Sequence, residues 1–216
     1  MDGEIIYKAA TWIMPILLAI TLHEYAHGWA ANKLGDSTAK MLGRLTANPI
    51  KHIDPVGTIL IPGMLLLTSA PFLFGYAKPI PVNTRNLKNI RKDMALIAIA
   101  GPLANLCMAF AWGFALLLVN SIGDPAIAKG IWQMSINGVL INVVLMVLNL
   151  LPLPPLDGGR VLAGIVPRNI ANTLDNIEPY GFFILLGLMI MGVLSSILNP
   201  FVIPITNFIL SLFTSL

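Results

Sequence analysis

Long apolar runs constrain this sequence more than any other feature. Several of them approach or exceed the roughly 20 residues that an α-helix needs to cross a bilayer. The composition agrees, because 56% of the 216 residues are hydrophobic and only 11% are charged, giving a mean hydropathy of +0.81. These values lie far outside the range of ordinary soluble domains. The sequence therefore predicts an all-α polytopic membrane protein whose length is used up by spans and short loops.

The apolar runs predict about five transmembrane helices in a single membrane domain that covers residues 1–216. The first helix is expected over residues 5–34, where a following glycine and aspartate indicate a helix stop. The other helices are expected at residues 94–119, 131–151, 179–198 and 200–216.

A further apolar run, residues 56–77, lies between two basic loops, residues 33–54 and 78–92. A full crossing by this run would leave one basic loop on the wrong side of the membrane. We therefore expect a re-entrant hairpin. Its prolines and glycines predict a partly β-like backbone, which survives at membrane depth only against protein or a wet cavity. Basic loops that set orientation account for the net charge of +3 and do not indicate a nucleic-acid partner.

The first predicted helix contains the sequence HEYAH. His23 and His27 are four residues apart, so on a helix they project from one face and can share one metal ion. Glu24 beside them can reach a water on that metal without being a ligand, as a general base requires. Burying three ionisable groups in a membrane helix costs several kcal/mol, which favours a metal site. The alternative is a buried polar network without metal.

A catalytic zinc usually takes three protein ligands, so a third ligand has to come from elsewhere. Asp157 is the best candidate, because it follows the proline-rich end of a predicted span and precedes two glycines. The helix carrying HEYAH and the span before Asp157 both end on the basic side of the membrane. The alternative is that LDGG forms only a turn.

These segments resemble the site-2 proteases, a family of zinc-dependent intramembrane metalloproteases. HEYAH at 23–27 resembles the family's HExxH motif, and NLLPLPPLDGG at 149–159 resembles its second signature. GPLAN at 101–105 and GYAKPIPVN at 75–83 are similar to segments of compact members. The resemblance covers residues 20–160 and implies zinc ligands His23, His27 and Asp157, with Glu24 as the catalytic base. No insert is long enough for a PDZ or CBS domain.

Other polar residues in the apolar runs are weaker candidates. Asn105 and Asn149 are candidate donors to the oxyanion of a scissile carbonyl, although hydrogen bonding between helices explains them equally well. We favour Asn149, because it belongs to the matched signature. His52 precedes the re-entrant run, and a loop histidine without a metal role is the simpler interpretation. Asn137 and Asn142 are interpreted as packing contacts between helices.

The function that we expect is hydrolysis of a peptide bond within or near a transmembrane helix of a membrane-protein substrate, with one Zn²⁺ per chain. The partners are then the substrate's transmembrane segment and the lipid bilayer. The resemblance and the compact chain point to a prokaryotic plasma membrane, with the active site nearer the cytoplasmic face. The alternative is a zinc-binding membrane transporter or metal sensor. A transporter usually shows repeated halves and a polar path, whereas this sequence shows one cluster and no repeat.

Overall fold

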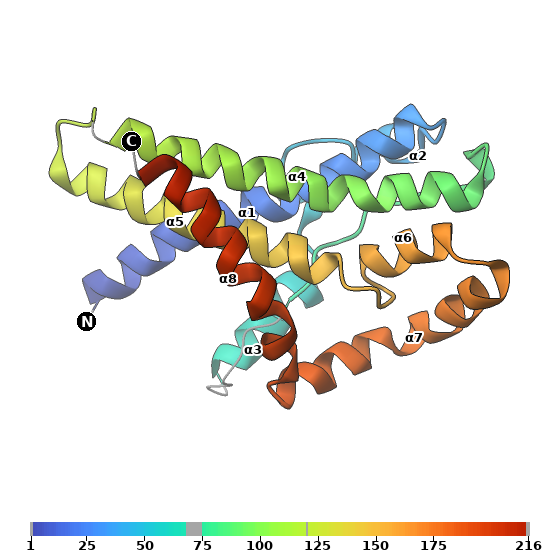
Figure 1. Cartoon of the computed structure of the whole chain (residues 1–216). Coiled ribbons are helices and arrows are strands. Elements are labelled where there is room, and N and C mark those ends of the chain that lie inside the picture. The colour runs from blue at the N-terminus through green and yellow to red at the C-terminus, as the bar shows by residue number, and fades with distance from the viewer. Residues whose placement is uncertain (1, 68–74, 120, 215–216) are drawn as a thin grey trace.

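Helices make up most of the computed structural model, which describes residues 2–67, 75–119 and 121–214. No strand occurs in these three ranges. Long helices alternate with loops and short helical turns, and the chain begins and ends in a long helix (Figure 1). The elements are α1 (Asp2–Lys33), α2 (Thr38–Met41), η1 (Pro49–His52), η2 (Pro55–Leu60), α3 (Ile61–Leu67), η3 (Thr84–Asn86), α4 (Ile90–Val119), α5 (Pro125–Asn149), α6 (Asp157–Ile165), α7 (Arg168–Ile190) and α8 (Val193–Thr214).

Four helices in the described ranges are long and apolar enough to cross a membrane: α1, α4, α5 and α8. The prediction of about five spans was therefore wrong by one. The apolar run at 179–198 is divided at Gly192, which has a φ of +71°, a conformation that glycine adopts readily at helix ends. Its helical part before this turn, residues 179–190, rises only about 18 Å, well short of the roughly 30 Å hydrocarbon core.

The boundary expected near residue 199 was also wrong, because Pro200 lies inside α8. Proline is tolerated in membrane helices where neighbouring groups satisfy the freed backbone carbonyl. The other expected spans correspond to α1, α4 and α5, with ends shifted by a few residues.

The run predicted as a β-like hairpin begins as helix. The Asp54 side chain accepts hydrogen bonds from the backbone N–H groups of Val56 and Gly57, which caps η2, and α3 continues from it. A helix satisfies its own backbone groups in an apolar setting, which explains why helix replaces the expected strand here. Residues 68–74 of this run lie outside the described residues.

After this run the chain nevertheless comes back to the residues at which the run begins. The backbone N–H of Tyr76 donates to Gly57 O at 3.0 Å, and that of Lys78 donates to His52 O at 2.9 Å. Residues 75–83 then continue without helix or strand. This irregular segment, residues 75–83, passes beside α1, as described below.

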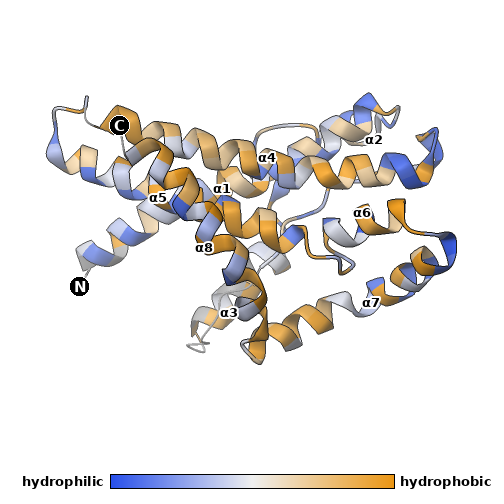
Figure 2. Cartoon of the chain, viewed as in Figure 1, coloured by the Kyte–Doolittle hydropathy of each residue, from blue (hydrophilic) through white to orange (hydrophobic). Residues whose placement is uncertain are grey.

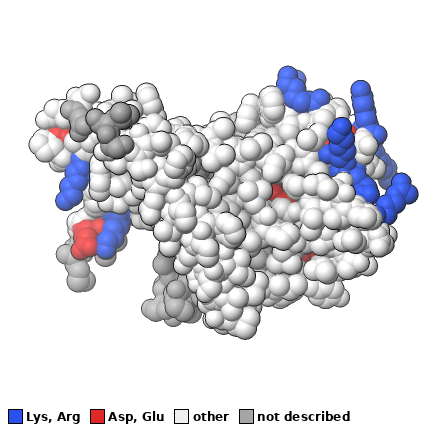
Figure 3. Space-filling model, viewed as in Figure 1, with Lys and Arg blue, Asp and Glu red and all other residues white. Residues whose placement is uncertain are grey.

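Apolar packing joins α4, α5 and α8 in one core, in which Ala109, Val139 and Ile209 are almost fully buried. A second cluster joins the end of α1 to the start of α4 through Ala31 and Ile97. Figure 2 shows apolar residues along all the long helices and hydrophilic residues at the tips. Lys and Arg gather at the end that carries α2 and the start of α4 (Figure 3). The two clusters together therefore fix α1, α4, α5 and α8 against one another.

Candidate active site

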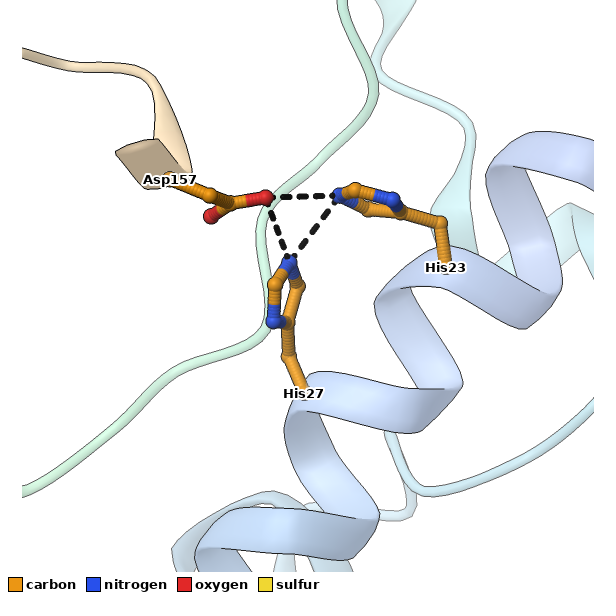
Figure 4. A group of neighbouring side chains, drawn as sticks. All are labelled: His23, His27 and Asp157. Carbon is orange, nitrogen blue, oxygen red and sulfur yellow. Dashed lines mark hydrogen bonds and ion pairs between the residues drawn. The ribbon is translucent and has the colours of Figure 1, made fainter. Parts of the chain in front are cut away.

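His23 and His27 lie on one face of α1 with their Nε2 atoms 3.0 Å apart. Asp157, the first residue of α6, brings Oδ2 to 3.2 Å from His23 Nε2 and 3.3 Å from His27 Nε2. Figure 4 shows the three side chains converging from α1 and from the start of α6. His23 is 8% exposed and Asp157 is 7% exposed. Two segments separated by about 130 residues of chain thus form one buried cluster whose candidate ligand atoms all lie within 4.8 Å of one another.

The two glycines after Asp157 allow a close packing of backbone. A Cβ atom on Gly158 would collide with the carbonyl oxygens of Leu150 and Leu151, and one on Gly159 with the backbone of Pro154. These glycines allow the start of α6 to fold onto its own proline-rich loop, and this packing sets the position of Asp157.

The opposite nitrogen of each ring faces a hydrogen-bond acceptor in α4. His23 Nδ1 lies 2.6 Å from Asn105 Oδ1, and His27 Nδ1 lies 2.8 Å from the backbone oxygen of Ile97. Since an oxygen of this kind only accepts, each Nδ1 carries the proton and each Nε2 presents a lone pair. Partners at the second nitrogen are how proteins orient metal-binding histidines.

Three lone-pair acceptors therefore converge without a donor between them. Asp157 Oδ2 is buried and has no hydrogen-bond partner among the described residues. Two imidazole nitrogens and a carboxylate oxygen repel one another at these distances unless a cation lies among them. This donor set suits zinc. The residues present thus fit a bound metal ion.

Gly101 in α4 provides the space in which the two rings sit. A Cβ atom there would lie 2.5 Å from His27 Cε1 and Nε2 and 2.6 Å from His23 Cε1. GPLAN contributed to the family resemblance, but no role was predicted for Gly101. A glycine inside an apolar helix is the sequence signal that could have indicated a close approach of another element.

Glu24 lies next to the cluster but is not part of the ligand set. Its Oε2 accepts a hydrogen bond from the backbone N–H of Ile80 at 2.8 Å. A cavity of about 360 Å³ is lined by Glu24 together with both histidines and Asp157. A carboxylate held beside a metal-binding cluster, facing the same cavity, is placed for proton transfer.

A second and larger cavity, of about 600 Å³, shares His23 and Glu24 with the first. Apolar side chains from four helices form its walls: Ile20 of α1, Val144 and Leu148 of α5, Leu185 of α7, and Leu198 of α8. An apolar chamber leads in this way to the polar cluster.

Comparison with known proteins assigns the family. The chain is 41% identical over 207 residues to the "Putative zinc metalloprotease YwhC" of Bacillus subtilis, which covers 94% of this chain and 91% of that protein. The model of peptidase family M50 matches residues 119–192. The chain belongs to peptidase family M50, the family of the site-2 proteases. Membership confirms the predicted resemblance and the prediction of a metalloprotease in an integral membrane protein.

More distant relatives of this M50 chain are also named as proteases. The "Putative zinc metalloprotease Rip2" of Mycolicibacterium smegmatis is 29% identical over 89% of this chain and 70% of its own length. The "Regulator of sigma-E protease RseP" of Escherichia coli is 27% identical over 62% of this chain and 30% of its own length. No solved structure matches the chain.

The remaining predicted residues of this M50 chain fall in different places. Asn149 lines both cavities and donates one amide hydrogen to Leu145 O at 2.9 Å. His52 is 2% exposed and is bonded through Nε2 to Thr46 O, and it does not belong to the metal-binding cluster. Asn105 contacts the back of the His23 ring. Asn142, which we interpreted as a packing contact, is bonded to Asn105.

Proposed function

We propose that this chain is a zinc-dependent intramembrane endopeptidase that cleaves a transmembrane segment of a membrane protein. The observation that carries the proposal is the convergence of His23, His27 and Asp157, with Glu24 beside them, at the end of a membrane helix. The family and the names of its relatives support zinc as the metal. His23, His27 and Asp157 would hold it.

When bound, zinc supplies Lewis acidity that lowers the pKa of water and polarises the scissile carbonyl. Glu24 accepts the proton of the attacking water and passes it to the leaving amine. The Ile80 N–H holds one carboxylate oxygen of Glu24 and leaves the other free for this transfer. Asn149 donates to the developing oxyanion through the amide hydrogen that is not bonded to Leu145.

The substrate enters through the larger cavity. Its apolar walls suit a transmembrane segment, and its shared lining with the metal cluster gives that segment access to Glu24. A helical substrate has to unwind locally, because its backbone groups are bonded internally. The irregular segment, residues 75–83, borders both cavities through Tyr76 and Ala77 and is the edge to which an unwound substrate adds by backbone pairing.

Few donors are left on this edge. The N–H groups of Tyr76, Lys78 and Ile80 are bonded to Gly57, His52 and Glu24. Residues 79 and 81 are prolines without an N–H. Among residues 76–81, the backbone N–H of Ala77 therefore has no partner among the described residues and is available to a substrate. We place the pairing at Ala77.

The charges set the orientation. Eleven of the thirteen Lys and Arg residues lie at or after the C-terminal end of α1, before or in the first turn of α4, or after α5, whereas Lys8 and Lys129 lie at the opposite end. By the positive-inside rule, the basic end faces the cytoplasm. The active site then lies nearer the cytoplasmic face of a prokaryotic plasma membrane.

The test uses purified full-length protein, a transmembrane peptide and measured zinc stoichiometry. We expect the wild type to bind one zinc and cleave the peptide, Glu24→Gln to keep zinc and lose cleavage, and Asp157→Ala to lose both. Retained cleavage by Glu24→Gln would overturn the proposal. A transporter would instead be supported if the wild type binds zinc and carries zinc into proteoliposomes, and neither the wild type nor a variant cleaves the peptide.

A further inference from the structure

We infer that Asn105 and Asn142 form a hydrogen-bond relay that holds the His23 ring in the tautomer and orientation needed to bind the metal. The inference rests on the proposed metal site. It makes Asn105 a positioning residue instead of a donor to substrate, and it gives Asn142 a role that the sequence did not suggest.

The relay crosses three helices. Asn105 of α4 places Oδ1 2.6 Å from His23 Nδ1 and donates through Nδ2 to Asn142 Oδ1 of α5 at 3.0 Å. Asn142 in turn donates through Nδ2 to Gly138 O at 2.8 Å. Asn105 and Asn142 are both 0% exposed, so no water competes for these bonds.

The orientation of the Asn105 amide is fixed by its surroundings. Its Nδ2 donates to the backbone oxygen of Ala19 at 3.3 Å as well as to Asn142, which uses both amide hydrogens. A flipped amide would turn its oxygen toward these two acceptors and its hydrogens toward His23. Asn105 Oδ1 therefore faces His23, and the ring proton has to sit on Nδ1.

The amide of Asn142, one step further from the metal, cannot flip either. Its Nδ2 is held by the backbone of α5, so its Oδ1 has to face Asn105. Each bond in this series donates in the same direction, away from His23, and aligned bonds of this kind reinforce one another. The result is an Nε2 lone pair that points at His27 and Asp157.

The two histidines differ in a way that explains the need for a relay. His27 donates to a backbone carbonyl, Ile97 O, whose position is fixed by α4 itself. His23 has only a side chain as its partner, and an isolated amide can turn. The bond to Asn142 removes this freedom.

Helix packing alone would also place amides between helices, and Asn137 provides the matched control. It lies on α5, is 3% exposed, and donates to Thr11 O of α1 at 3.2 Å. Like Asn142, it is a buried amide between α5 and another helix, but none of its hydrogen bonds leads to the metal cluster.

The experiment measures zinc affinity by chelator competition on the full chain in detergent, with thermal unfolding of each metal-free protein as the measure of packing. We expect Asn105→Ala to weaken zinc binding about 10- to 100-fold and Asn142→Ala to weaken it about 3- to 10-fold. Asn137→Ala should destabilise the metal-free protein as much as Asn142→Ala does but leave zinc affinity unchanged. In an Asn105→Ala background, Asn142→Ala should have no further effect on zinc affinity.

Three results would overturn the relay and leave the proposed function intact. One is unchanged zinc affinity in Asn142→Ala, which does not touch His23 and remains informative even if Asn105→Ala fails to fold. Another is equal weakening by Asn137→Ala, which would show a packing effect. A third is an additive loss in the double variant. A wild-type chain that binds no zinc would overturn the proposed function and the relay together. Wild-type zinc affinity in both Asn105→Ala and Asn142→Ala would overturn the relay alone.

Discussion

The Glu24 carboxylate accepts a 2.8 Å hydrogen bond from the backbone N–H of Ile80, 56 residues further along the chain. The proposed base is therefore positioned by the irregular segment, residues 75–83, as well as by its own helix. This segment is anchored in turn by Asp36, whose Oδ2 accepts from Asn83 N at 2.7 Å. The position of Glu24 depends on a short series of contacts outside the HExxH motif.

Removing the Ile80 N–H should slow cleavage without releasing metal. Ile80→Pro deletes this donor, and a hydrogen bond to a charged group contributes about 1.5–3 kcal/mol, so we expect kcat to fall about 10- to 100-fold. Ile80→Ala is the control, because it keeps the N–H and loses only side-chain packing. The measurement is kcat and KM on a transmembrane peptide, with zinc content determined in parallel. Equal losses in both variants would exclude a role for the N–H.

Asp36→Asn should loosen the same segment from its other end. The buried Asp36 carboxylate accepts four hydrogen bonds, from Thr38 N, Thr38 Oγ1, Asn83 N and Asn86 Nδ2. An amide cannot accept all four, so we expect a loss of about 1.5–3 kcal/mol in stability at neutral pH and a lower kcat. Asp124→Asn is the control, because it changes an exposed helix cap at which asparagine works equally well.

The pH dependence of stability follows from the same carboxylate. Burial alone raises the pKa of Asp36, but hydrogen bonds from Thr38, Asn86 and Asn83 outweigh burial and hold the pKa below its ordinary value of 3.8. A depressed folded pKa means that the stabilisation is complete above the unfolded pKa and is lost as the pH falls through the folded one. Thermal unfolding of wild type and Asp36→Asn should therefore differ most at neutral pH and converge below pH 3.8. A constant difference would contradict this origin.

The convergence of His23, His27 and Asp157 was predictable because such residues are rare in so apolar a chain. His23 and His27 have the spacing of a helical metal site, and Asp157 was one of few carboxylates at the right end of a span. Gly101 and Asn142 were not predictable in the same way. Helices α4 and α5 are apolar on every side, so no amphipathic pattern marks which face is buried in protein and which meets lipid.

Helix ends were predicted less well than helix positions for a related reason. The expected spans began at Pro179 and Pro200, but both prolines lie inside helices. In lipid a helix is the way a segment satisfies its own backbone, so one missing N–H does not end it. The turn occurs where Gly192 adopts a positive φ.

Gly57→Ala should impair substrate binding. A Cβ atom at this position would collide with the ring of Tyr76, which lines both cavities. Displacing this ring shifts the edge to which the substrate adds, so we expect KM to rise severalfold, by about 3- to 10-fold, with zinc content unchanged. Gly63→Ala is the matched control in the same run, because its Cβ meets open space. If both variants cleave like the wild type, the edge does not bind substrate.

Gly101→Ala should act on the proposed metal site itself. The added methyl group would occupy the space of the His23 and His27 rings, and rings that cannot converge bind metal poorly. We expect zinc affinity to fall at least about 10-fold, measured by chelator competition. Gly130→Ala on α5, where a Cβ atom meets nothing, should bind zinc normally. Full zinc affinity in Gly101→Ala would mean that the metal-bound rings lie elsewhere.

Gly181→Ala tests whether α7 holds Asp157, the proposed third ligand, in place. A Cβ atom on Gly181 would collide with Pro154 O and lie 2.5 Å from Pro155 Cδ, in the loop that leads to Asp157. The Arg160–Glu178 ion pair also joins α6 to α7, at 3.1 Å, but its side chains are 45% and 41% exposed, and such pairs contribute little. The close packing at Gly181 is thus the stronger connection between α7 and this loop.

We expect Gly181→Ala to cost about 1–3 kcal/mol in stability through overpacking and to weaken zinc binding as the loop and Asp157 shift. Gly187→Ala, in open space on the same helix, controls for the change in helix propensity. Chelator competition and thermal unfolding measure the two effects separately. A destabilised Gly181→Ala protein with wild-type zinc affinity would show that the loop keeps Asp157 in position without α7, so that α7 can move while the metal site stays intact.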